Sequence, residues 1–382
     1  MNFKIYYPKC RSDLFTYTII LITIIFFVST YSFADERKFI RALYLPIADN
    51  YTGIIAFEKY RDKMVFADFS LERMDSWPEM RAYFISGEVD MAFITAPLAM
   101  DMFLENPDFK CVSLMNRDGG AMAINDLLNT YVKLSSNRKD RKPDNRVADA
   151  FARIKKEMGN PSKCAVSSLL SVDTVILYKY LNDHGKTLSI ERDKIADVIV
   201  YPIDPIKSPS FIKENNSRMN PVSFEQSIPW ADVVETNKFG YLAWYSKDVI
   251  IWPNGHVNCI AVATVSCIQN KKEALKEVIT YLHQAGMDIE AARTKGGRDM
   301  VDLIDTIRLH IPEHNEEAIV QSLRSDVNVI NYKNLNVDIN GLKFIMKLAI
   351  DAGIMKQNID MEKFVDQNFS TNISTSHFFI NN

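Results

Sequence analysis

The chain is predicted to be an α/β protein with mostly parallel sheets, and its composition and its pattern of apolar runs support this class. It has 382 residues, of which 47% are hydrophobic and 24% charged, as in an ordinary globular protein. Short apolar runs alternate with amphipathic stretches from Phe39 onward. Strands that alternate with helices are typical of a parallel sheet with helical connections. The length is sufficient for two domains.

The first part of the chain is expected to contain four strands and three helices. We predict strands at residues 39–48, 63–70, 89–94 and 109–115. Asp49 or Asn50 is expected to cap the first helix. Ser76 and Glu79 have the spacing of a capping box, which predicts a helix that begins at Trp77. Pro97 is expected to open the third helix, because proline is tolerated in a first helical turn.

The middle of the chain is expected to form a shorter α/β unit. We predict a helix that ends at Gly159, a strand at 163–168, a helix from about Ser171 and strands at 196–203 and 239–246. Four prolines indicate an irregular stretch that ends near residue 230: Pro202, Pro205, Pro209 and Pro221. A charged run at 135–146 is expected to be a solvated loop.

The last part of the chain returns to longer elements. Residues 257–268 are predicted to be a strand, and Asn270 with Glu273 is expected to cap the helix that follows. Gly353 lies where the residue after a helix C-terminus belongs.

The N-terminus has the pattern of a secretory signal peptide. Lys4, Lys9 and Arg11 precede a short apolar run that ends in small residues at Ala34, which predicts a signal peptide over residues 1–34. An uncleaved anchor is the alternative, although the run is short for a span of about 20 residues. Cys10 precedes the apolar run, so we expect a periplasmic protein without a lipid anchor.

Composition and motifs exclude several function classes. The net charge is −3 with interspersed signs, which gives no electrostatic footprint for nucleic acid or an anionic membrane surface. Enzyme signatures such as the nucleophile elbow, the dinucleotide-binding glycines and the zinc-protease motif are absent. Pro312 separates His310 from His314, so we expect no shared metal-binding face there. We predict neither a metal nor a cofactor.

The cysteines after the signal peptide are expected to be small core residues, although an oxidising compartment permits a disulfide. They form no Cys-x-x-Cys pair and have no histidine at zinc-ligand spacing. They are Cys111, Cys164, Cys259 and Cys267.

Three motifs, in order behind a signal peptide, carry a resemblance to a known family. They are Gly87-Glu88-Val89-Asp90-Met91-Ala92, Thr95-Ala96-Pro97 and Arg117-Asp118-Gly119. Residues 339–370 also resemble that family's closing helix and final segment. Over most of the mature chain, the sequence resembles periplasmic substrate-binding proteins of the nitrate/sulfonate/bicarbonate type, the solute receptors of ABC importers.

The resemblance implies a two-lobe periplasmic binding protein fold of type II, with the ligand in the interlobe cleft and two chain crossovers. Residues 35–125 and 255–382 are expected to form the first lobe, and residues 126–254 the second. It also implies a receptor that is not an enzyme, closes by hinge motion and delivers its solute to an ABC permease in the inner membrane. We expect a monomer.

Most candidate ligand-binding residues lie at the carboxyl ends of predicted strands or at the starts of helices, where ligands bind in α/β folds, and Glu225 and Trp230 lie in the stretch expected to be irregular. They are Asp49, Trp77, Thr95, Asp118, Gly119, Ser171, Asp173, Glu225 and Trp230. For three of them a structural role is the alternative: Trp77 as a hydrophobic staple, Thr95 as a helix cap and Gly119 as part of a plain turn.

The ligand is expected to be a small organic or anionic solute. The residues favour an organic one, with or without an amine, held by Trp77 and Trp230 with Asp or Glu as partner. Val172 and Gly120 stand where nitrate-type members place polar residues. The candidate positions offer carboxylates more readily than cations, apart from Arg117 and Lys247, so an inorganic anion is disfavoured.

Two other functions are compatible with the same fold. A thiamine-pyrimidine synthase shares it, but that enzyme uses a cysteine-rich cluster and histidine chemistry, and no such cluster is found in this sequence. A periplasmic ligand-sensing domain is the other alternative.

Overall fold

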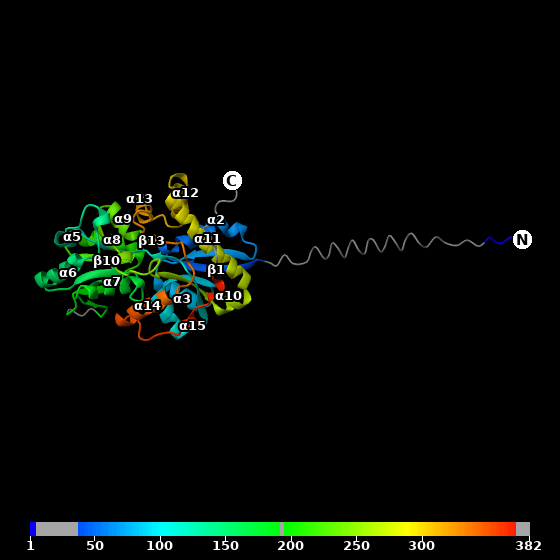
Figure 1. Ribbon diagram of the computed structural model, residues 1–382, viewed down its shortest axis with the longest axis horizontal. Helices are drawn as coiled ribbons and strands as arrows, with labels where there is room; N and C mark the ends of the chain where they lie inside the picture. Colours follow the sequence, from blue (N-terminus) through cyan, green and yellow to red (C-terminus); the bar gives the residue numbers. More distant parts are fainter. Residues whose placement is uncertain (5–36, 192–194, 372–382) are drawn as a thin grey trace.

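The computed structural model describes residues 1–4, 37–191 and 195–371. Most of the predicted signal peptide lies outside these residues, so its assignment remains a prediction. Within the described ranges, no helix combines the length and the apolar character needed to cross a membrane. Figure 1 shows the middle of the chain, in green, at one end of the molecule and the first strands, in blue, toward the other.

The first sheet has five strands in the order β2-β1-β3-β12-β4. Its strands are β1 (Lys38–Tyr44), β2 (Ala67–Arg73), β3 (Met91–Thr95), β4 (Phe109–Leu114) and β12 (Cys259–Thr264). β1 pairs in parallel with β2 and β3, whereas β12 runs antiparallel between β3 and β4. All four strands predicted in the first part of the chain are present, but two bounds are wrong: β1 ends at Tyr44 rather than at residue 48, and β2 begins at Ala67 rather than at residue 63.

The helices of the first lobe include the predicted helix at Trp77. The first-lobe and C-terminal helices are α2 (Tyr51–Tyr60), α3 (Trp77–Ile85), α4 (Ala96–Glu105), α10 (Val265–Asn270), α11 (Lys272–Lys295), α12 (Gly297–His310), α13 (Glu316–Ser322), α14 (Ile339–Asp351) and α15 (Met361–Phe364). Ser76 accepts a hydrogen bond from the Glu79 backbone N–H at 3.3 Å, which is the cap that the sequence predicts. Gly353 follows α14 with φ 71°, as expected.

Two predictions for the last part of the chain are wrong in detail. The predicted strand at 257–268 ends at Thr264, because the Thr264 side chain accepts from the Cys267 N–H and begins α10. Asn270 does not cap α11, because it is the last residue of α10 and Lys271 occupies the cap position.

The second sheet has six strands in the order β11-β6-β10-β7-β9-β8. Its strands are β6 (Gly120–Ile124), β7 (Ser162–Val166), β8 (Leu188–Ser189), β9 (Val198–Pro202), β10 (Val222–Ser227) and β11 (Tyr241–Tyr245), and its helices are α5 (Asp126–Val132), α6 (Asn145–Met158), α7 (Val172–Asp183), α8 (Ser208–Ser217) and α9 (Trp230–Thr236). β7 pairs in parallel with β9 and β10, and β6 is antiparallel to β10. Both sheets therefore combine a parallel set with one inserted antiparallel strand.

Short elements complete the described chain. A two-stranded sheet joins β5 (Arg117–Asp118) to β13 (Ile330–Asn331). The 3-10 turns are η1 (Ala48–Asn50), η2 (Arg61–Lys63), η3 (Arg138–Asp140), η4 (Pro205–Lys207), η5 (Ser246–Asp248) and η6 (Gln367–Phe369).

The stretch that four prolines marked as irregular contains regular structure. Pro205 and Pro209 lie in the first turns of η4 and α8, where the missing N–H breaks no helical hydrogen bond. Pro221 directly precedes β10, so the strand keeps its hydrogen bonds. The expectation of an irregular stretch up to residue 230 is therefore wrong for residues 208–217 and 222–227.

The chain passes between the sheets twice, as a two-lobe type II fold requires. It leaves the first sheet after β4 and enters the second at β6, and it returns between β11 and β12. Residues 120–124 thus belong to the second sheet, although the sequence assigned them to the first lobe, because β6 pairs with β10 and β11. We call the two sheets with their covering helices the first and second lobes.

Candidate functional site

The two lobes contact each other where their parallel strands end. Asp49, in η1 directly after β1, is fully buried and its carboxylate is the centre of this contact. It accepts hydrogen bonds from Asn116 Nδ2 at 2.6 Å and from Ser227 Oγ at 2.5 Å, and Asn258 Nδ2 lies 3.2 Å from both of its oxygens. Because Ser227 ends β10 of the second sheet, Asp49 connects the lobes.

Burial determines the proton affinity of Asp49. Desolvation raises the pKa of Asp49 to about 8, and the negative charge of Asp173 adds to that shift, whereas hydrogen bonds from Ser227, Cys259 and Asn116 oppose it. The Cys259 thiol lies 3.6 Å from the carboxylate, and burial raises the pKa of that thiol well above its usual range. Asp49 therefore holds a proton near neutral pH in the structure as described.

A second polar connection runs from Trp77 to Asp173. Trp77, the first residue of α3, donates from Nε1 to Ser167 Oγ at 2.9 Å, and Ser167 in turn donates to the Asp173 carboxylate. Asp173 lies in the first turn of α7 and is buried. Burial raises the pKa of Asp173 to about 6, although hydrogen bonds from Ser167 and Ser171 oppose the shift. Trp77 thus makes a polar contact to the second lobe in addition to its packing.

Thr95 and Trp230 also join the lobes. Thr95 Oγ1 accepts from the Val172 N–H at 3.0 Å and makes no capping bond to its own helix, so the capping alternative for its hydroxyl is wrong. Trp230, at the start of α9, donates from Nε1 to the Pro46 carbonyl at 3.0 Å. Ser171 instead has a local role, because its hydroxyl accepts from the Thr174 N–H and caps α7.

Asp118 and Gly119 lie at the first chain crossing, beside the polar groups around Asp49. The Asp118 carbonyl accepts from Asn116 Nδ2 at 2.9 Å and from Asn258 Nδ2 at 3.1 Å, and a Cβ atom on Gly119 would lie 3.0 Å from Asp49 Oδ1. Asp118 accepts from the His256 N–H at 2.9 Å, and burial raises its pKa. Gly119 has φ 100°, a conformation that favours glycine, and its carbonyl accepts from the Ile228 N–H at 2.8 Å. The turn therefore fixes the crossing through its backbone.

The Arg117 guanidinium has partners other than the carboxylates of Asp49, Asp173 and Glu225. Its guanidinium donates to the Asp338 carboxylate at 3.0 Å, to the Gly255 carbonyl at 3.1 Å and to the Asn334 carbonyl at 3.0 Å. These contacts attach the crossing to the segment before α14. They also pair the Arg117 charge with Asp338, so that this charge is not available to bind an anion.

Glu225 is the most isolated of the predicted site residues. It lies in β10, is fully buried, and both of its carboxylate oxygens are without a hydrogen-bond partner among the described residues. Its pKa is raised well above the ordinary value, chiefly by burial and further by the negative charges of Asp173 and Asp49. Three predicted carboxylates, two from the second lobe and one from the first, are thus close enough to influence one another.

Several residues of this site were missed from the sequence. They are Asn116, Ser167, Ser227, Asn258 and Cys259, which contact Asp49 or Asp173. In the sequence, four of them could have been found as polar residues at the end of a buried apolar run. Ser167 and Asn116 follow strands, Ser227 ends a strand, and Asn258 precedes one.

The cysteines and histidines have structural surroundings. All four described cysteines are buried and unpaired, which confirms their prediction as core residues. His310 contacts Glu58 at 2.7 Å and His314 contacts the Tyr51 hydroxyl at 2.9 Å, so the two rings have separate partners. In the part of the chain that the structure describes, no group of three or more His, Cys, Asp or Glu side chains is arranged to hold a metal ion.

Two α/β lobes, two crossings and buried polar groups at the facing strand ends define the class: the periplasmic binding protein fold. The chain belongs to the NMT1-like family, whose sequence profile matches residues 35–304. A search of curated proteins found no match.

Solved structures show the same fold at low identity. The nitrate-binding protein NrtA of Synechocystis aligns with a TM-score of 0.71 and 15% identity over 87% of each chain. The ligand-binding component of an ABC-type import system of Staphylococcus aureus, with zinc bound, aligns at 0.64 and 16% over 87% of this chain and 98% of that one. The alkanesulfonate-binding protein SsuA of Xanthomonas axonopodis aligns at 0.62 and 11% over 86% and 97%.

Proposed function

We propose that this chain is the solute-binding receptor of an ABC import system. The observation that carries the proposal is the convergence of buried polar side chains from both lobes on one interlobe site around Asp49, Asp173 and Glu225. Support comes from the similar structures, which are named as ligand-binding proteins. The receptor would act in the periplasm as a monomer, after removal of residues 1–34, and deliver its solute to an inner-membrane permease.

The proposed mechanism is hinge closure around the solute. Along the part of the chain described by the structure, the two crossings at residues 115–119 and 246–258 are the covalent connections between the sheets, so a rotation there changes the interlobe distance. The Thr95 to Val172 and Trp77 to Ser167 hydrogen bonds form only when the lobes are in contact. A solute that touches both lobes therefore shifts the population toward the closed form.

The proposed ligand is a small organic solute rather than an inorganic anion. Asp173 and Asp49, both negative when ionised, are the charged groups that act on Glu225, and Arg117 is bound to Asp338. A buried anion needs donors to balance its charge, and an arrangement of carboxylates opposes it. This site differs in that respect from what a nitrate receptor requires.

We propose a receptor rather than an enzyme because its cysteines are poorly suited to catalysis. A catalytic thiol needs a lowered pKa, whereas burial raises the pKa of Cys259, the thiol beside Asp49, well above its usual range. The carboxylates are held by neutral serine and asparagine side chains, an arrangement suited to binding.

The direct test is to purify the mature chain from its native compartment, denature it and identify any released solute by mass spectrometry. Titration calorimetry with that solute is expected to show one saturable site. A thermal-shift screen covers solutes that are lost in purification. If no solute is released and no cation, anion or neutral compound in the screen raises the melting temperature, the receptor proposal is wrong.

Import and sensing can then be separated in cells. We expect cells without the chain to lose high-affinity uptake of the identified solute. Normal uptake together with loss of a transcriptional response to the solute would favour the sensing alternative instead.

A further inference from the structure

Glu225 lies on the face of β10 that leads to the interlobe site. Alternate residues of a strand share a face, so Glu225 and Ser227 point to the same side. Ser227 reaches Asp49 of the first lobe, and Glu225 lies about 7 Å further back along the strand. Ile176 of α7, one turn after Asp173, lies beside the same carboxylate near Gly120. The carboxylate therefore lies behind Ser227, between β6, β10 and α7.

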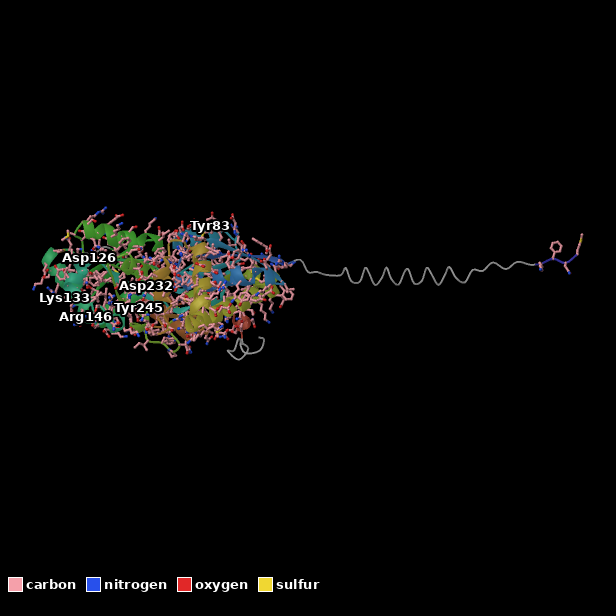
Figure 2. The ribbon with its side chains drawn as sticks, turned by 90° about the horizontal axis from the view of Figure 1, so that it is seen from above. Tyr83, Asp126, Lys133, Arg146, Asp232 and Tyr245 are labelled. Carbon is pink, nitrogen blue, oxygen red and sulfur yellow. The ribbon has the colours of Figure 1, made fainter. Side chains whose placement is uncertain are left out.

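Other buried carboxylates in the described chain have partners. Asp232 accepts from the Arg138 guanidinium at 2.6 Å, and Glu290 accepts from Arg293 at 2.8 Å. Figure 2 labels Asp232 and Tyr245, which both lie beside the Arg138 guanidinium in the second lobe. Within the described ranges, Glu225 is the buried carboxylate for which neither oxygen has a hydrogen-bond partner. A buried polar group without a hydrogen-bond partner lowers the free energy of unfolding, so its presence indicates a role in function rather than in stability.

Gly120, which has no side chain, leaves room for the Glu225 carboxylate. A Cβ atom at position 120 would lie 2.6 Å from Glu225 Oε1, which is closer than real contacts allow. It would also lie 3.1 Å from Ser246 Cβ, and Ser246 Oγ accepts from the Gly120 N–H at 2.9 Å. The neighbouring groups thus hold the carboxylate in place without a hydrogen bond to either oxygen.

We infer that Glu225 is the acceptor for a cationic nitrogen group of the solute, so that the ligand class is small organic cations with paired N–H donors, such as amidinium or guanidinium groups. This inference rests on the proposed receptor function. Two free oxygens of one carboxylate match two parallel N–H donors, the geometry of a bidentate pair. Asp173, and Asp49 once it has lost its proton, add negative charge that favours a cation and disfavours an anion.

The inference can be tested with matched pairs of small probes that differ in charge but not in shape. The mature chain is titrated at millimolar concentrations with acetamidinium against acetamide, and with methylguanidinium against methylurea, and its melting temperature is followed. We expect the two cations to raise the melting temperature in a saturable manner and the two neutral probes to leave it unchanged. This comparison uses the wild-type chain and needs no variant to fold.

Two variants locate the effect. Glu225→Gln keeps the shape but removes the charge, and we expect it to bind the cations at least tenfold more weakly. Glu214→Gln is the matched control, because Glu214 is exposed on α8, and it should bind them like the wild type. Circular dichroism verifies that both variants are folded.

The outcomes separate the inference from the function on which it rests. Equal effects of cations and neutral probes, or unweakened cation binding by Glu225→Gln, would overturn the inference. If neither cation acts while a neutral or anionic solute stabilises the chain, the inference fails and the receptor function stands. If no solute of any charge acts, both fail.

Discussion

Asp49→Asn should reduce the pH dependence of folding stability. The Asp49 pKa is about 8 in the folded protein, against 3.8 for an exposed aspartate as in the unfolded chain, because burial disfavours the charged form. Between these values the folded chain binds more protons than the unfolded chain, so the free energy of unfolding falls as pH rises. Stability linked to this group is fully present below pH 3.8 and is lost as pH rises through about 8.

The size of the effect follows from the shift. At 1.36 kcal/mol per pH unit, the Asp49 contribution to the change between pH 5 and pH 8 is about 3–4 kcal/mol. Asparagine does not titrate and still offers an oxygen to the two asparagine donors. The variant should therefore lose about this much of the pH dependence, while Asp173 and Glu225 keep their part.

Urea denaturation at pH 5, 6, 7 and 8, without added solute, measures the effect. Asp68→Asn is the matched control, since Asp68 is exposed on β2, and its pH dependence should equal that of the wild type. If Asp49→Asn and the wild type lose equal stability between pH 5 and pH 8, then the Asp49 carboxylate is not shielded from water in solution. The burial of Asp49 between the lobes would then be wrong.

Three further changes should weaken binding of the co-purified solute, measured by calorimetry, without loss of fold. Thr95→Val leaves the Val172 N–H unpaired and should reduce the affinity for the solute about tenfold, whereas Thr95→Ser should bind like the wild type. Equal affinity of the two variants would show that the Thr95 to Val172 hydrogen bond is unimportant for binding. Trp77→Phe removes the donor to Ser167 and should reduce the affinity for the solute about threefold to tenfold. Unchanged affinity would show that Trp77 acts through packing alone. Gly120→Ala should cost more than tenfold, because its Cβ would displace the neighbouring carboxylate, and unchanged affinity would contradict that crowding.

The elements that the sequence predicted well have local causes. The start of α3 follows from Ser76 and Glu79, three residues apart, and the end of α14 follows from Gly353. The first-sheet strands are apolar runs between turn signals. Such features depend on neighbours in the sequence, so periodicity and capping rules suffice.

The elements that were missed depend on distant partners. No strand was predicted at residues 120–124, yet β6 is a central strand because β10 and β11 supply its hydrogen bonds from about 100 residues away. Helix α8 was not predicted, because its prolines were interpreted as signs of irregular structure. Proline in a first turn is nevertheless compatible with a helix.

The same limit applies to the site. Asp49 was a candidate from its place after β1, but its partners Asn116, Ser227 and Asn258 are 67, 178 and 209 residues away in sequence. Only the fold brings them together. Nor did the sequence indicate that Glu225 would lack a partner while Asp232 has Arg138, since Arg138 is 94 residues away from Asp232 in sequence.

Closure of the lobes and the charge of the proposed ligand are coupled by the buried carboxylates. When the lobes separate, water reaches Asp49 and Asp173, their pKa values return toward 3.8, and both ionise at neutral pH. Closure without a cation then requires proton uptake by Asp49 and Glu225, whose pKa values burial raises most, whereas Asp173, with a pKa of about 6, stays mostly ionised at neutral pH. A cationic solute on Glu225 can take the place of those protons, since its positive charge stabilises the ionised carboxylates around it. The closed form is thereby favoured by a cation more than by a neutral molecule of the same shape, so the groups that would bind the solute also make closure depend on its charge.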